Sequence, residues 1–125
     1  MTSAPTILIA EDEALLRLVA VEALHDAGYD VLEAGDGNEG LALLRTAGRI
    51  DLLVTDIKMP GLNGYQLAEA GLRLRPEMKV VLMTGYSDEQ VPDAIRQATI
   101  KIFHKPFNFD DLIAFIGKIM APRPA

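Results

Sequence analysis

Short apolar runs alternate along this chain with stretches of helical periodicity, and this alternation constrains the fold more than any other feature. Five such runs occur, at residues 7–10, 31–32, 52–54, 80–83 and 100 with 102–103. Three are continuous and rich in Val, Ile and Leu, which is typical of strands buried on both faces of a parallel sheet. Strand followed by helix, five times over, predicts a doubly wound α/β fold with right-handed connections.

Five helices are expected, over residues 13–27, 37–47, 63–74, 91–98 and from Asn108 onward, where Asn108 and Asp111 have the spacing of an N-cap and its N3 acid. Gly28 is a plausible stop for the first helix. The periodicity predicts which residues face inward. In the first helix they are Leu16, Val19, Ala20, Ala23, Leu24 and Ala27, and in the third helix they are Leu67, Ala70 and Leu74. Around Pro76, a solvated turn is expected to hold Arg73, Arg75 and Lys79.

Composition narrows the class of protein. One domain is expected from 125 residues, and the absence of Cys excludes disulfides and cysteine-based zinc sites. A net charge of −6 argues against nucleic acid as the main partner, because binding phosphates draws on a basic surface. No apolar run reaches the roughly 20 residues of a membrane span, and no secretory signal is visible. We therefore expect a soluble cytoplasmic protein with no membrane partner.

Polar residues follow the predicted strands at their carboxyl ends. Glu11 and Asp12 come after the first strand, Asp56 after the third, Thr84 after the fourth and Lys105 after the fifth. In an open α/β sheet the functional site lies beyond the carboxyl ends of the strands, so these five residues are expected to converge at one edge.

The chemistry of this residue set points to a metal and a phosphoryl group. Clustered carboxylates repel one another without a compensating cation, and ligands that are all oxygen suit Mg²⁺. Asp56 is then a candidate nucleophile, Lys105 a point charge for the phosphoryl group and Thr84 a hydroxyl donor to it. No glycine-rich dinucleotide motif or Walker A run is present, and an acidic loop after the first strand would repel a nucleotide phosphate.

Four segments together resemble the receiver domain of two-component response regulators. They are Ile7–Glu13, Asp56–Gly64, Met83–Gly85 and His104–Phe107. The resemblance covers residues 5–120, with 121–125 expected as a frayed tail. It implies a flavodoxin-like (CheY-like) three-layer sandwich, whose five-stranded parallel sheet has the strand order 2-1-3-4-5.

Roles for the strand-end residues follow from the resemblance. It implies that Asp56 is the phosphoacceptor and that Glu11 and Asp12 hold Mg²⁺ with it, joined by the backbone carbonyl of Lys58. Thr84 would be the switch hydroxyl. Lys105 would contact the phosphoryl group, which would come from a phosphohistidine on a sensor histidine kinase or a histidine phosphotransfer protein. Such a chain is not an ordinary enzyme, because it catalyses only its own phosphorylation and dephosphorylation.

The sequence departs from the family pattern in its switch residues. Ile102 stands where receivers usually carry an aromatic residue, and Phe103 comes one position later. Tyr86 could supply the missing aromatic group, and we expect ordering of residues 85–98 to accompany switching. Asp is also common at the position of Glu11. The longer side chain of Glu11 would bring its carboxylate closer to the metal.

Several forms of output are compatible with the residues. The main expectation is a single-domain regulator without a DNA-binding output domain, which signals through a downstream protein partner. Exposed Leu15 and Leu18, in one stripe with Glu22, could dock a kinase helix. The alternatives are the receiver module of a hybrid histidine kinase, a pseudo-receiver that binds partners without phosphorylation, or an Mg²⁺-dependent phosphohydrolase. A phosphohydrolase of this kind is expected to carry an Asp-x-Asp motif after the first strand, and this sequence lacks it there.

Overall fold

Five parallel strands form a single sheet in the computed structural model, which describes residues 4–85 and 91–122. The order across the sheet is β2-β1-β3-β4-β5, as predicted. The strands are β1 (Thr6–Ala10), β2 (Asp30–Ala34), β3 (Leu52–Asp56), β4 (Lys79–Thr84) and β5 (Lys101–His104). All four strand pairs are parallel, so every strand ends at the same edge of the sheet.

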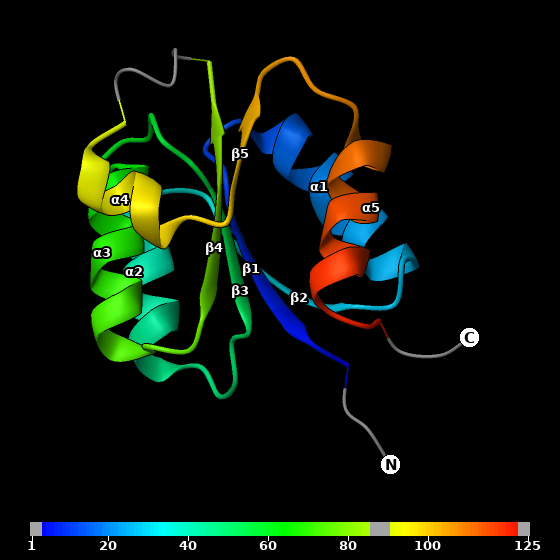
Figure 1. Ribbon diagram of the computed structural model, residues 1–125, viewed down its shortest axis with the longest axis horizontal. Helices are drawn as coiled ribbons and strands as arrows, with labels where there is room; N and C mark the ends of the chain where they lie inside the picture. Colours follow the sequence, from blue (N-terminus) through cyan, green and yellow to red (C-terminus); the bar gives the residue numbers. More distant parts are fainter. Residues whose placement is uncertain (1–3, 86–90, 123–125) are drawn as a thin grey trace.

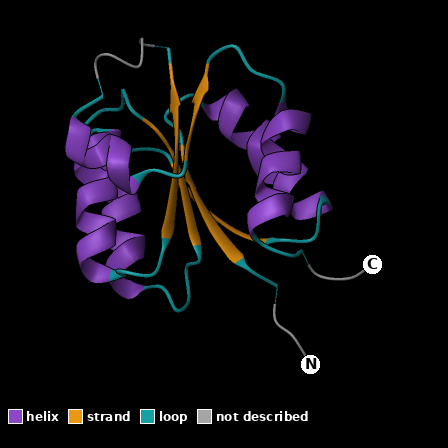
Figure 2. Cartoon of the chain, in the orientation of Figure 1, coloured by secondary structure: helices purple, strands orange, loops and turns teal. Residues whose placement is uncertain are grey.

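Helices cover both faces of the sheet and complete a three-layer sandwich (Figure 1). Figure 2 shows the sheet edge-on between the two helical layers, one made by α1 and α5 and the other by α2, α3 and α4. The helices are α1 (Ala14–Asp26), α2 (Gly37–Thr46), α3 (Gly64–Leu74), α4 (Asp93–Ala98) and α5 (Phe109–Ile119). Within residues 4–85 and 91–122, no helix has both the length and the apolar character to cross a membrane.

Two apolar cores lie on opposite faces of the sheet, because successive strand residues point to opposite sides. Ile7 and Ile9 of β1 face the core beneath α1 and α5, together with Val54 of β3. Leu8 and Leu53 face the core beneath the other three helices. Nearly all of these side chains are completely buried, as the continuous apolar runs predicted.

Side-chain caps set where several helices begin. Asn63 and Gln66 form a capping box at α3, with each side chain accepting a hydrogen bond of 2.9 Å from the other's backbone N–H. Asn108 caps α5 as predicted, although its side chain accepts from the N–H of Asp110 rather than Asp111. Gly28 follows α1 with a positive φ of 101°, a conformation that favours glycine at a helix end.

Two residues expected to face inward lie instead at the surface. Val19 is 40% exposed, because α1 buries the narrow stripe of Ala20 and Leu24 and one residue is about 100° of rotation around a helix. Leu74, the last residue of α3, is 48% exposed and lies beyond the buried part of that helix. The other inward positions predicted for α1 and α3 are buried or half-buried.

Arg75 was expected in a solvated turn and is instead a structural residue. Its guanidinium donates hydrogen bonds to the backbone carbonyls of Leu44, Ala47 and Gly48, at 3.0, 2.8 and 2.5 Å. These carbonyls lie at the end of α2, where the helix itself provides no donors for them. A planar group with five N–H donors can serve several such oxygens at once, and Arg75 therefore fastens the end of α2 to the end of α3.

Candidate functional site

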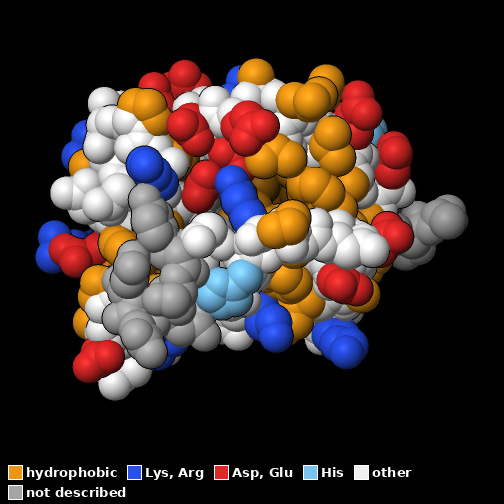
Figure 3. Space-filling model, turned by 90° about the horizontal axis from the view of Figure 1, so that it is seen from above, with side chains coloured by type: hydrophobic (Ala, Val, Ile, Leu, Met, Phe, Trp, Pro, Cys, Tyr) orange, Lys and Arg blue, Asp and Glu red, His pale blue; other side chains and the backbone are white. Residues whose placement is uncertain are grey.

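The polar residues that follow the strands meet at the carboxyl edge of the sheet, as predicted. Glu11 follows β1, Asp56 is the last residue of β3, and Lys105 follows β5. These residues continue the alternation that turns Ile9, Val54 and Phe103 toward α1 and α5, so their side chains share one side of the sheet. Seen from above this edge, a basic side chain lies among acidic ones, with an apolar area beside them (Figure 3).

Glu11 is a buried carboxylate with partners for both of its oxygens. The residue is only 2% exposed. Oε2 accepts a hydrogen bond of 3.1 Å from the backbone N–H of Glu13, and Oε1 lies 2.7 Å from Nζ of Lys105. Burial raises the pKa of Glu11 above its ordinary value, even though both hydrogen bonds act to lower it.

Lys105 bridges the two buried carboxylates. Its Nζ donates to Oε1 of Glu11 at 2.7 Å and to Oδ2 of Asp56 at 2.8 Å. Burial alone would lower the pKa of the Lys105 ammonium, but the hydrogen bonds and charges of Asp56 and Glu11 raise it above its ordinary value. The ammonium is therefore held in its charged form directly beside Asp56.

Asp12 completes an acidic cluster that fits a divalent cation. Carboxylate oxygens of Glu11, Asp12 and Asp56 lie within 4.8 Å of one another, and Asp12 is the member exposed to solvent. A donor set made only of oxygen suits Mg²⁺, which keeps several waters and takes one or two carboxylates. Lys105 supplies one positive charge to three carboxylates, so the cluster retains a negative surplus for a cation. Lys58 is exposed close by in the chain, and a ligand role for its carbonyl stays a prediction.

The predicted switch residues are only partly placed by the structure. Thr84 ends β4 with a fully buried side chain and continues the alternation toward the face of α4 rather than that of α1 and α5. Ile102 packs partly buried against the core under α4, whereas Phe103 lies in the opposite core. The ring of Phe103 therefore does not take the place of the absent aromatic at 102. Tyr86 lies outside the described residues.

Arg17 contacts the site although it was not among the residues predicted for it. Nη1 donates to the backbone carbonyl of Glu11 at 2.8 Å, and Nε lies 3.2 Å from Oε1 of Glu33 on β2. The loop that carries the first two acids is thereby tied to α1 and β2. One signal was available in the sequence, because Arg17 is the only Lys or Arg among the first 44 residues.

Gly64 allows the site to be compact. A Cβ built at this position would lie 2.3 Å from the carbonyl oxygen of Asp56, closer than any side chain permits. The N–H of Gly64 donates to the carbonyl of Ile57 at 2.8 Å. The start of α3 can therefore pack directly against the end of the strand that carries Asp56.

Comparison with known proteins places this geometry in a family. Residues 7–117 match the model of the response regulator receiver domain. The chain belongs to the response regulator receiver domain family. The receiver protein CpdR of Brucella abortus is 34% identical over 115 residues, which are 91% of this chain and 95% of that protein. Other curated relatives are longer, and the chain spans 54% of one and 13% of another.

Solved receiver structures share the fold closely. A CheY-like receiver domain protein from Methanospirillum hungatei superposes with a TM-score of 0.86 at 32% identity, covering 94% of each chain. The response regulator TrrA from Thermotoga maritima, in complex with Mg²⁺ and BeF, gives a TM-score of 0.81 at 32% identity, covering 93% of this receiver and 99% of TrrA. The receiver resemblance and the CheY-like fold expected from the sequence are confirmed.

Proposed function

We propose that this receiver accepts a phosphoryl group on Asp56, in a reaction that depends on Mg²⁺. The observation that carries the proposal is Nζ of Lys105, which lies 2.8 Å from Oδ2 of Asp56 and is anchored on its other side by Glu11. An ammonium fixed at the acceptor oxygen is placed to neutralise charge that arrives there. Transfer of a phosphoryl group rests mainly on positioning and on charge stabilisation of this kind.

The donor we propose is a phosphohistidine of a sensor histidine kinase or a histidine phosphotransfer protein. A carboxylate oxygen of Asp56 attacks the phosphorus, the P–N bond to the donor imidazole breaks, and the leaving nitrogen takes up a proton from its surroundings. The product is an acyl phosphate on Asp56. Lys105 then pairs with a phosphoryl oxygen. The Thr84 hydroxyl, which is buried on the side of α4, would turn toward Asp56 and donate a hydrogen bond to another phosphoryl oxygen. The chain catalyses only this transfer and the hydrolysis of its own acyl phosphate, in which water attacks, Asp56 is restored and inorganic phosphate leaves.

Glu11, Asp12, Asp56 and the carbonyl of Lys58 are the residues we propose to hold the metal. Bound Mg²⁺ would offset the repulsion between these carboxylates and an incoming phosphoryl group. The likeness to TrrA, whose structure contains Mg²⁺ and BeF, supports this part of the proposal. The cluster within 4.8 Å supports it independently.

Output is proposed to pass through contact with a downstream protein rather than with DNA. The main form is a free-standing regulator that works in the cytoplasm, where ATP-dependent kinases act, and the second is the receiver module of a hybrid histidine kinase. The exposed Leu15 and Leu18 at the start of α1 are the proposed contact with the donor, at 68% and 52% exposure.

Incubation with acetyl phosphate and Mg²⁺, followed by intact-mass measurement, tests the acceptor. The mass should rise by one phosphoryl group, and the gain should vanish in Asp56→Asn and on chelation with EDTA. Asp26→Asn is the matched control, since Asp26 is an exposed residue at the far end of α1 and should leave the gain unchanged. A folded protein with no adduct under any condition would favour a pseudo-receiver. Sustained turnover of unrelated phosphoesters would favour a phosphohydrolase.

A further inference from the structure

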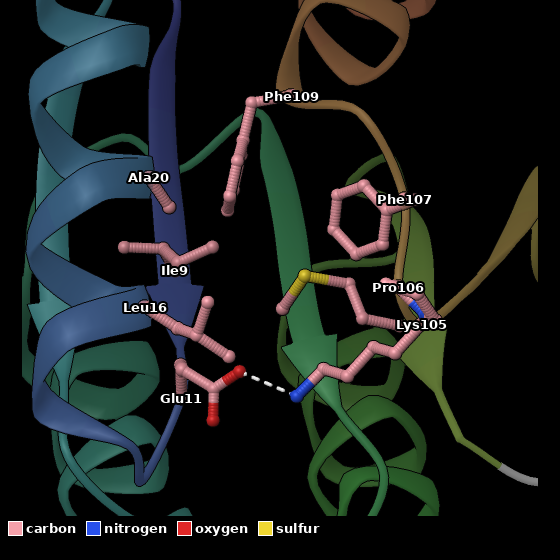
Figure 4. Close-up of a pocket in the computed structure, with 9 residues that line it drawn as sticks. Ile9, Glu11, Leu16, Ala20, Lys105, Pro106, Phe107 and Phe109 are labelled. Carbon is pink, nitrogen blue, oxygen red and sulfur yellow. Dashed lines mark hydrogen bonds and ion pairs between the residues drawn. The ribbon is translucent and has the colours of Figure 1, made fainter.

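A cavity of about 280 Å³ opens beside the acidic cluster, between α1 and the segment that joins β5 to α5 (Figure 4). Its two polar lining groups are Glu11 and Lys105, and Figure 4 shows them bonded to each other at one end. The rest of the wall is apolar and consists mainly of Ile9, Leu16, Ala20, Met83, Phe107 and Phe109.

The cavity exists because one short side chain faces rings that are held in place by one another. Ala20 is buried on α1 and fills little of the space between the helix and the sheet. The rings of Phe107 and Phe109 lie 5.2 Å apart between centroids, and Phe107 lies 5.5 Å from Phe103. Tilted ring pairs at this separation stabilise each other. The rings of Phe107 and Phe109 therefore stay packed against each other and do not move into the space beside Ala20.

Water gains few hydrogen bonds in this space, although the cavity is open to solvent on one side. A buried water needs two to four polar partners, and the only polar side chains in the wall already hydrogen-bond to each other at 2.7 Å. An enclosed apolar cavity of about 150 Å³ in another protein binds benzene, and the opening of the present cavity gives a ligand a way in. A cavity of about 280 Å³ can accept a larger ring system.

The wall also selects the charge of a ligand. A carboxylate or ammonium on the ligand would be removed from water and would compete with the existing ion pair for one of its members. Met83 and the rings of Phe107 and Phe109 favour an aromatic ligand without charge, because sulfur and aromatic rings both pack well against aromatic groups. We propose that this cavity is a binding site for an uncharged aromatic small molecule of one or two fused rings. The cavity shares Glu11 and Lys105 with the acidic cluster at one end, and its apolar wall extends from there between α1 and the segment that joins β5 to α5. The proposal does not depend on phosphorylation.

Titration with indole, followed by methyl NMR of the intact chain, tests the site. The methyl signals of Ile9, Leu16, Ala20 and Met83 should shift in a saturable way, with a dissociation constant on the order of 1 mM or tighter. Indole-3-carboxylate and tryptamine have the same ring system with a negative and a positive charge, and each should bind at least about tenfold more weakly.

Variants separate the cavity from surface binding. Ala20→Leu should fill the space and weaken indole binding at least about tenfold, whereas the same change at Ala42, exposed on α2, should leave it unaltered. Phe109→Ala removes one wall at a half-buried position and serves if Ala20→Leu does not fold. The proposal is overturned if no saturable shift is seen, if the shifted methyls lie elsewhere, or if folded Ala20→Leu or Phe109→Ala binds like the unaltered chain.

Discussion

The carboxylate of Glu11 is buried, and burial disfavours its charged form. This single residue therefore makes the stability of the fold depend on pH. Burial raises the pKa of Glu11, so the folded chain keeps a proton there at pH values where the unfolded chain has lost it. The contribution of Glu11 to the free energy of unfolding therefore falls as the pH rises through and above 4.5, the ordinary value for this group.

Glu11→Gln removes this titration. We expect the free energy of unfolding of the variant, relative to the unaltered chain, to increase between about pH 4 and about pH 7.5. Urea denaturation at both pH values measures the difference. Glu22→Gln, at an exposed position of α1, is the control for the substitution itself. A difference for Glu11→Gln that stays constant over this range would contradict the assignment of the buried charge.

Gly64 tests how closely a helix can approach the acceptor strand. In Gly64→Ala, the new Cβ meets the carbonyl oxygen of Asp56 at 2.3 Å, a backbone atom that cannot turn away. We expect a loss of about 2 kcal/mol in the free energy of unfolding, because α3 must shift. Gly117→Ala on α5 is the matched control. Nothing lies within 4 Å of its new Cβ, so this change should stabilise the helix by up to about 1 kcal/mol. Equal effects at the two sites, measured by chemical denaturation, would contradict the steric argument.

Among the secondary-structure elements, the ends of α2 and α3 are held side by side by Arg75 and not by a covalent bond. Lys has one ammonium where Arg has a planar fork, so Arg75→Lys cannot serve the carbonyls of Leu44, Ala47 and Gly48 together. We expect a loss of about 2 kcal/mol in the free energy of unfolding. Hydrogen exchange should show the loss first in the last turn of α2.

The control for this variant lies two residues away. Arg73 forms an exposed i,i+4 pair with Glu69, with 77% of the arginine side chain accessible. Arg73→Lys should change stability by less than about 0.5 kcal/mol. If Arg73→Lys and Arg75→Lys lower the free energy of unfolding by the same amount, Arg75 does not hold the end of α2.

For the molecule as a whole, the proposed metal site predicts that cation binding is coupled to folding. A cation that binds only the folded chain stabilises it by about 1.4 kcal/mol at ten times its dissociation constant. We expect the melting temperature to rise with MgCl₂ beyond its value in NaCl of equal ionic strength. Asp12→Asn should remove this rise and, without metal, should relieve repulsion within the cluster. An unchanged response in Asp12→Asn would exclude Asp12 as a ligand.

The sequence was sufficient for features that depend on the backbone and on periodicity. Runs such as Ile7–Ala10 and Leu52–Val54 predicted the parallel sheet, and parallel strands necessarily bring Glu11, Asp56 and Lys105 to one edge. Features that depend on long side chains were not predictable. Arg75 bonds to residues about 30 positions away, and only the packed helices determine which carbonyls it reaches. The cavity is likewise a property of the packed molecule, since no local pattern shows what lies opposite Ala20.

One structural feature has a practical consequence for observing this protein in solution. The chain contains four Phe and no Trp. All four rings form a single row, from Phe115 through Phe103 and Phe107 to Phe109. The phenylalanine fine structure in near-ultraviolet circular dichroism therefore originates in one wall of the molecule, the wall that borders Lys105. Near-ultraviolet circular dichroism can therefore follow changes in that wall without an added label.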